Sequence, residues 1–193
     1  MCQRAYSQKF AKPFSAIFIV SDACHGEQGS IDQILNEEQP KLNIKDKIMF
    51  DIVSTQFAIH YMFEDELKLR GYLQNVSKRL LEGGLFIGTT IDADRLVHKV
   101  REAGIENNLT IGNEFYSIVF GQDNFRRSQG PFGLKYYFYL ADAIGRRMTS
   151  GPIQYVDEYL VPFDALTEIA AEYGLQLQKK QNFHEYFDEQ LYK

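Results

Sequence analysis

Cysteine is scarce in this sequence, and long apolar runs are absent. The 193 residues include two cysteines, Cys2 and Cys24, which are too few for a disulfide framework and favour a reducing compartment. His25 follows Cys24, but no second pair stands at zinc-ligand spacing, so the sequence predicts no metal site. No apolar run is long enough to span a bilayer and the first residues do not form a signal peptide, so no membrane partner is expected.

The sequence also lacks an excess of positive charge. Its formal net charge is −5 and its pI is near 5.4. Proteins that grip long nucleic acids usually present a basic face, because neutralising phosphates supplies most of the affinity. We therefore expect that any bound nucleotide is recognised through a small, specific part of it.

Glycine-rich ligand turns are missing as well. Open α/β sheets bind nucleotide-like ligands at the carboxyl ends of their strands, and a glycine-rich turn after the first strand usually cradles the phosphate or ribose. The chain has 14 glycines but not one Gly-x-Gly. A site of this kind would lack its usual first-strand half.

Apolar and aromatic residues, by contrast, are plentiful. Hydrophobic residues make up 45% of the chain and charged residues 24%, with 15 Phe and 12 Tyr. This composition is typical of a globular protein. The length suits one domain or most of a larger one.

Strand and helix patterns alternate along the first half of the chain. Short apolar runs rich in β-branched and aromatic residues predict buried strands at 14–20, 50–54 and 85–90. Apolar residues at helical spacing predict helices within 25–47, 64–82 and 94–103. The order of strand, helix and strand predicts a parallel α/β sheet.

The remaining patterns predict element ends and a less regular second half. Gly83-Gly84 is interpreted as the left-handed stop of the helix at 64–82. Aromatic alternation at 135–140 (KYYFYL) predicts an antiparallel excursion, and a last helix closed by Gly174 is expected before a strand at 175–183.

Several sequence blocks stand in a characteristic order: FDIVSTQFAIHYMFE, NVSKRLLEGGLFIGTTID, GNEFYSIVF, FGLKYYFYL, DEYLVPFDAL and FHEYFDE. Together, from about Cys2 to Tyr186, they resemble messenger RNA cap (guanine-N7) methyltransferases. GGLFIGTT alone would indicate only a class I methyltransferase, whereas its combination with QFAIHY is distinctive. The resemblance implies an α/β fold with a class I methyltransferase (Rossmann-like) sheet, and a cap-binding excursion at roughly 105–160.

The resemblance also implies a methyl donor, S-adenosylmethionine, and residues that bind it. Those toward the donor are Ser21, Asp22, Gln56, Phe57 and Tyr61. Asp22 matches the acid that accepts a hydrogen bond from the adenine amino group. Those toward the cap guanine are His60, Tyr61 and Glu158, and none of them acts as an acid or base.

The chemistry of cap methylation agrees with these residue types. Guanine N7 has a free lone pair, so displacement on a sulfonium methyl group needs no general base and depends on proximity, orientation and electrostatics. Guanine presents two adjacent donors, N1–H and N2–H₂, which one carboxylate such as Glu158 accepts in parallel. Because alkylation makes the base cationic, we expect Glu158 to stabilise the product side more than the substrate. His60 offers a ring N–H to guanine O6.

Each of these residues also has an ordinary structural interpretation. Asp22 could cap a helix, and a histidine at a strand exit is more often structural than functional. Phe57 and Tyr61 could be core residues, and Glu158 alone would be a plain loop acid. The ordered blocks, rather than any single residue, favour function.

The chain departs from the family in several places. The family's glycine-rich first strand, its lysine-bearing helix and its last strands have no counterpart here. Ile91 stands where the family usually has proline, and 143–155 (AIGRRMTSGPIQY) is inserted before Glu158. We therefore expect a single partial domain over 1–193, with an incomplete sheet, unpaired strand edges, exposed apolar surface and little or no activity of its own.

Two other functions stay open beside cap methylation. The chain could be a non-catalytic binding module that uses the exposed sheet edge, or a class I methyltransferase for another small substrate. QFAIHY and Glu158 argue against the latter. The resemblance further implies the capped 5′ end of mRNA as a partner, a small activating protein in some members, and the nucleus as the location.

Overall fold

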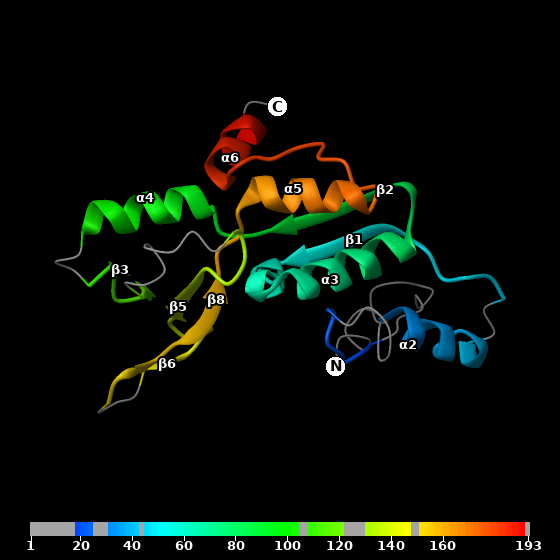
Figure 1. Cartoon of the computed structure of the whole chain (residues 1–193), viewed down its shortest axis with the longest axis horizontal. Coiled ribbons are helices and arrows are strands. Elements are labelled where there is room, and N and C mark those ends of the chain that lie inside the picture. Colours follow the sequence, from blue (N-terminus) through cyan, green and yellow to red (C-terminus); the bar gives the residue numbers. More distant parts are fainter. Residues whose placement is uncertain are drawn as a thin grey trace.

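The structure is a computed structural model that describes residues 18–24, 31–42, 45–104, 108–121, 130–147 and 151–191. The elements within these ranges are α2 (Ile31–Glu38), η1 (Pro40–Leu42), β1 (Phe50–Gln56), η2 (Ile59–Glu64), α3 (Glu66–Arg79), β2 (Leu80–Thr89), α4 (Ala93–Ala103), β3 (Thr110–Gly112), β4 (Tyr116–Phe120), β5 (Lys135–Leu140), β6 (Arg146–Arg147), β7 (Ile153–Gln154), β8 (Val156–Tyr159), α5 (Phe163–Glu172) and α6 (Phe183–Leu191). Figure 1 shows their arrangement. None of these helices is long and apolar enough to cross a membrane.

The strands β1 and β2 form a parallel pair that α3 connects, so the predicted α/β arrangement is confirmed. Ile52 lies opposite Leu85 and Gln56 lies opposite Thr89. The two strands therefore end side by side, at the edge where α/β sheets place their ligands. Among the described strands β1 pairs with β2 alone, which leaves the outer edge of each unpaired.

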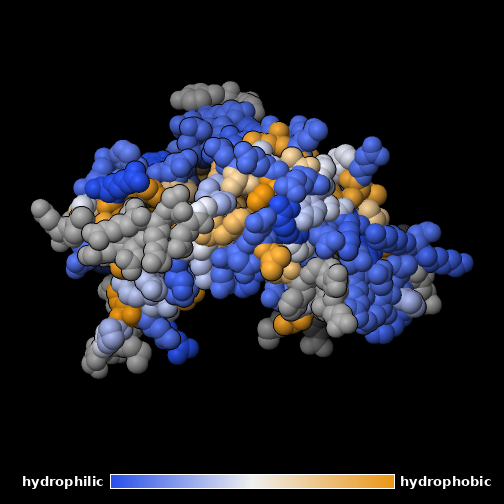
Figure 2. Space-filling view, in the orientation of Figure 1, coloured by the Kyte–Doolittle hydropathy of each residue, from blue (hydrophilic) through white to orange (hydrophobic). Residues whose placement is uncertain are grey.

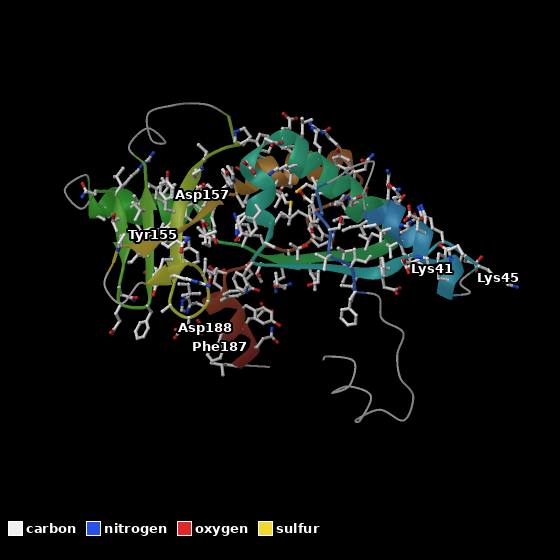
Figure 3. The ribbon with its side chains drawn as sticks, turned by 90° about the horizontal axis from the view of Figure 1, so that it is seen from below. Lys41, Lys45, Tyr155, Asp157, Phe187 and Asp188 are labelled. Carbon is white, nitrogen blue, oxygen red and sulfur yellow. The ribbon has the colours of Figure 1, made fainter. Side chains whose placement is uncertain are left out.

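Helices α3 and α5 cover one face of this pair, as Figures 1 and 3 show. Val53 and Phe86 point to that face, and the Phe86 ring lies 6.1 Å from the Tyr72 ring of α3. The alternation of a strand turns Ile52, Leu85 and Ile87 to the other face, where they are 56%, 51% and 45% exposed. Of the described helices, only α6 lies on that side (Figure 3).

The excursion predicted around KYYFYL is an antiparallel sheet, in the order β3-β4-β5-β8. Its side toward α4 packs into a hydrophobic cluster that includes Leu96, Val100, Phe120 and Tyr136, called here the α4 cluster. A second cluster, the α3 cluster, gathers η2, α3 and α5 around Phe63, Leu69 and Leu73. Tyr159 belongs to the α3 cluster and Leu160 to the α4 cluster, so the end of β8 lies between the two.

Helix α2 extends from this body as a peripheral element. Its outer surface is mostly polar (Figure 2). Among the residues of α2, Leu35 is the one whose side chain is buried. Arg79 anchors it: the guanidinium is 2% exposed and donates to Asp32 Oδ1 (2.5 Å), Asn36 Oδ1 (2.7 Å) and the Ile48 carbonyl (2.9 Å).

The glycine pair does not stop α3, so that prediction is wrong. The helix ends at Arg79, and Leu80 is already extended, with φ −81° and ψ 132°. Gly83 adopts φ +75° inside β2, where the pairing with β1 is irregular between Phe50 and Ile52. The left-handed residue therefore belongs to a strand irregularity, a position that favours glycine as much as a helix end does.

Two predicted strands also differ from the structure. Of the strand expected at 14–20, residues 14–17 lie outside the described residues, while Phe18 and Val20 are exposed and in no strand. The expected strand at 175–183 is wrong as well, because 175–182 form no strand and α6 begins at Phe183. An apolar run makes a strand only where a neighbouring strand supplies hydrogen-bond partners.

Candidate guanine site

The chain turns sharply after β1 and places His60 inside the protein. Phe57 adopts φ +50°, and its amide donates to the Thr89 carbonyl (3.1 Å) at the end of β2. The short helix η2 then buries His60, which is 4% exposed, while its neighbour Tyr61 stays 39% exposed. The two rings lie 4.2 Å apart between centroids, tilted by 54°.

Glu158 comes to the same place from β8. Its side chain is 1% exposed, and the Tyr136 hydroxyl donates to its Oε2 (2.6 Å). Oε1 lies 3.4 Å from His60 Nε2, but the two are not aligned as a hydrogen bond. Within the part of the chain that the structure describes, neither Glu158 Oε1 nor either nitrogen of His60 has a hydrogen-bond partner.

Such a set of unpartnered buried polar atoms is costly. A buried acceptor without a donor loses its hydration and gains nothing in return, at about 1–3 kcal/mol or more for a charged group. No lysine or arginine among the described residues forms an ion pair with Glu158. The arrangement can therefore accept N–H groups from a ligand at Oε1 and offer a ring N–H of His60 beside them.

The two tyrosines at Glu158 remain neutral donors near neutral pH. Burial, with a smaller effect of the Glu158 charge, raises the pKa of Tyr61 above its usual value. Burial and the hydrogen bond to Glu158 raise the pKa of Tyr136 further. Burial disfavours the charged phenolate, and the negative charge of Glu158 adds to this effect, which explains the common direction.

Gln56 and Phe57 lie at the ends of the parallel strands. Gln56 Nε2 donates to Ser54 Oγ (2.9 Å), and its Oε1 accepts from Thr89 Oγ1 (2.8 Å). The Phe57 ring is 59% exposed and contacts Phe183 of α6 edge to face, at 6.4 Å between centroids. These side chains border the edge at which a ligand of an α/β sheet would lie.

Ser21 and Asp22 lie elsewhere. Ser21 is exposed, and Asp22 Oδ1 accepts from the Cys24 amide (2.9 Å) in a local turn. Asp22 lines an open hollow beside α3 together with Asp65 and Lys68. The structure brings His60, Tyr61 and Glu158 together, and Asp22, which was expected at the donor rather than at the guanine, lies apart from them. The described residues thus place the three residues expected at the guanine side by side, and they do not form a closed pocket around the residues expected at the methyl donor.

The inserted segment leaves Glu158 in its strand. Part of it forms the hairpin of β6 and β7, and the Tyr155 hydroxyl lies 3.1 Å from Ser117 Oγ of β4. In Figure 3, Tyr155 and Asp157 lie along the antiparallel sheet. Ile91, at the position where proline is usual, packs against the α4 cluster.

Sequence reasoning missed Tyr136. Alternation in KYYFYL places it on one face of a strand, but only the register of β5 against β8 places it directly opposite Glu158. That register is set by the sheet as a whole and cannot be read from either strand alone.

Known proteins resemble this chain over most of its length. Residues 1–193 match the sequence model of the mRNA (guanine-N(7))-methyltransferase domain. The mRNA cap guanine-N(7) methyltransferase 1 of Arabidopsis thaliana is 39% identical over 166 residues, which are 84% of this chain and 39% of the relative. The namesake enzyme of Oryza sativa is 36% identical over 183 residues (93% of this chain, 43% of the relative). That of Schizosaccharomyces pombe is 37% identical over 164 residues (85% and 40%).

The chain spans about two fifths of the length of these relatives. The match to the family model nevertheless covers every residue of the sequence. The chain therefore belongs to the mRNA (guanine-N(7))-methyltransferase family.

Proposed function

We propose that this chain recognises the guanine of the mRNA cap and takes part in methylation of its N7, with S-adenosylmethionine as the methyl donor. The observation that carries the proposal is the buried Glu158 carboxylate, whose Oε1 has no hydrogen-bond partner among the described residues and lies beside His60. The capped 5′ end of mRNA is the proposed partner and the nucleus the proposed location. A small activating protein remains a prediction from the family.

The site offers guanine complementary groups on two sides. Glu158 can accept the N1–H and N2–H₂ donors, and His60 can donate a ring N–H to O6. Tyr61, half-exposed against the His60 ring, can pack on the base. Held in this way, guanine needs no base to expose its N7 lone pair, so these residues act by orientation and by favouring the cation that forms.

Fewer of the residues expected to bind the methyl donor lie together in the structure. S-adenosylmethionine would supply an electrophilic methyl group, and Gln56 and Phe57 border the strand ends where it would meet the base. Asp22, the other expected contact, lies in the hollow beside α3. We therefore propose that the 193 residues alone bind guanine caps but transfer methyl groups weakly.

Binding of cap analogues tests the recognition. Calorimetry on the purified chain should show tighter binding of a guanosine-capped dinucleotide than of an inosine-capped one, because inosine lacks the N2 amino group. Glu158→Gln should lower the guanosine affinity roughly 10- to 100-fold, the value of hydrogen bonds to a charged acceptor.

Asp157→Asn is the matched control. It removes the same charge from the adjacent position of β8, where the exposed carboxylate pairs with Lys135 instead (2.7 Å). Its affinity should equal that of the wild type. Equal binding of guanosine and inosine caps by the wild type would refute guanine recognition by Glu158.

The catalytic expectation has its own assay. Methyl transfer from S-adenosylmethionine to a guanosine-capped RNA should be slight for the isolated chain, because the described residues do not form a donor pocket. Robust turnover would contradict that expectation.

A second candidate function is a non-catalytic binding module. Two features favour it: no other described strand pairs with the outer edge of β1 or β2, and Ile52, Leu85 and Ile87 are exposed. Failure to bind either the cap analogue or S-adenosylmethionine, together with a stable complex with another protein, would favour this module over the cap enzyme.

A further inference from the structure

Tyr136 contacts different neighbours through its ring and through its hydroxyl. The ring is fully buried in β5 and stacks on Phe120 of β4, with centroids 5.5 Å apart and planes 28° apart. The hydroxyl donates to Glu158 Oε2 on the other side, in β8. One side chain thus connects the core of the antiparallel sheet to the candidate guanine site.

The strand register makes this connection rigid. Phe120 is the Cα partner of Tyr136, and Tyr136 is the Cα partner of Glu158. Directly opposed residues project to the same face of a sheet, so the three side chains form one row across β4, β5 and β8. The Tyr136 ring cannot turn without disturbing Phe120 and the α4 cluster, and its hydroxyl is held accordingly.

A held hydroxyl fixes the orientation of the carboxylate. The last torsion of a glutamate side chain is broad, so a carboxylate without partners samples many orientations. The Tyr136 hydroxyl occupies one acceptor site of Oε2, which leaves Oε1 directed to the His60 side at 3.4 Å from Nε2. A ligand that meets a fixed carboxylate loses less freedom on binding than one that must order it.

We propose that Tyr136 is a positioning residue for guanine recognition, acting through Glu158; this inference rests on the proposed function. Tyr136 itself has no exposed surface and does not touch the ligand. Its hydroxyl sets the plane in which Glu158 accepts N1–H and N2–H₂, and thereby the preference for guanine over a base that lacks the amino group.

Tyr136→Phe tests the proposal, because it removes the hydroxyl and keeps the ring stacked on Phe120. We expect the affinity for the guanosine-capped dinucleotide to fall roughly 5- to 20-fold, and the preference over the inosine-capped analogue to fall with it. Tyr139→Phe is the control, since Tyr139 is buried in the same strand but projects to the opposite face. It should bind like the wild type.

A double-mutant cycle distinguishes positioning from a general structural role. In a Glu158→Gln background, Tyr136→Phe should have no further effect on affinity, because the group through which it acts is already changed. Losses that simply add would overturn the inference. Full guanine preference in Tyr136→Phe would overturn it as well.

A measurement without ligand tests the hydrogen bond directly. The proton NMR spectrum of the free chain should contain a slowly exchanging hydroxyl signal that is absent in Tyr136→Phe and shifted in Glu158→Gln. Absence of the signal in the wild type would refute the positioning role, whatever the affinities are. If the wild-type chain binds no guanine cap, or binds inosine equally well, the proposed function fails instead, and this inference fails with it.

Discussion

At the residue scale, the contact between Tyr136 and Glu158 stands out. Among the described residues, the Tyr136 hydroxyl donates to Oε2 of Glu158, and no group donates to its Oε1. The contact joins two groups that would each be costly to bury alone. Burial of the phenol, together with its hydrogen bond to the Glu158 carboxylate, raises the pKa of Tyr136 well above its ordinary value of 10.0. Stability at alkaline pH should report this shift.

The raised pKa predicts a loss of stability above about pH 10. Below that pH both the folded and the unfolded chain keep the Tyr136 proton, and the protonated phenol contributes fully to the free energy of unfolding. As the pH rises further, the unfolded chain loses the proton and the folded chain retains it, so the free energy of unfolding falls by about 1.4 kcal/mol per pH unit from this group. In urea unfolding between about pH 9 and pH 11, Tyr136→Phe should show a shallower slope than the wild type, and the difference should approach this amount toward pH 11, where the unfolded chain has lost the proton. Identical slopes for the wild type and Tyr136→Phe would show that the folded chain does not hold this proton.

At this scale, the sequence predicted some residues of the candidate site and not others. His60 and Glu158 were predicted from blocks far apart in the chain, and the structure places them together. Asp22 was predicted to contact the adenine of the methyl donor rather than the guanine; it lies in a hollow beside α3, and its role stays a prediction. Tyr136 required the pairing of β5 with β8.

At the scale of elements, two arginines of α3 differ in burial and in the contacts that they make. Arg79, at the end of α3, is buried and bonded to α2 and to the chain before β1. Arg70, near the start of α3, is about one-third exposed and pairs with Glu66 and Glu172 on the surface. Desolvated groups left without partners cost far more than screened surface pairs.

Replacing each arginine by methionine should separate the two cases. Arg79→Met leaves Asp32 and backbone carbonyls without their donor, and should lower the free energy of unfolding by about 2–4 kcal/mol. Hydrogen exchange should also show α2 released from α3. Arg70→Met should cost less than about 1 kcal/mol. Equal losses in urea unfolding would contradict the anchoring role of Arg79.

Element prediction succeeded where periodicity was strong. The stripe on α3, the helix at 93–103 and the alternation of β5 each correspond to the predicted element. The errors fell on the glycine pair at Gly83 and on the strand expected at 175–183. A left-handed glycine serves helix ends and strand irregularities alike, and a strand depends on a partner that its own residues do not specify.

At the scale of the whole molecule, the parallel pair has one covered and one open face. Parallel sheets in α/β proteins usually have both faces covered. Here Ile52, Leu85 and Ile87 remain about half-exposed on the face opposite α3 and α5. The order of the sequence blocks predicted the family and the parallel unit, but the neighbours of β1 and β2 could not be inferred from their own residues.

The open face predicts association between chains. Wild-type chain should self-associate with rising concentration in sedimentation velocity, because exposed apolar surface next to an unpaired strand edge favours contact. Ile87→Lys should reduce this association and change the free energy of unfolding by less than about 0.5 kcal/mol.

Phe86→Lys supplies the opposite case in the adjacent position. Its side chain is partly buried and packs toward Tyr72 and the α3 cluster, so a charge there should lower the free energy of unfolding far more than Ile87→Lys does. An equally large loss for Ile87→Lys would show that the second face is covered in solution.

The position of Glu158 between the two clusters has a consequence for the biosynthesis of the protein. Chains emerge from the ribosome N-terminus first, so β1, η2 and α3 can pack while β8 is still inside the exit tunnel. During that interval His60 has no carboxylate beside it and stays accessible to water. A βαβ unit can therefore form before Glu158 is available, and His60 and Glu158 come together only when β8 joins β5.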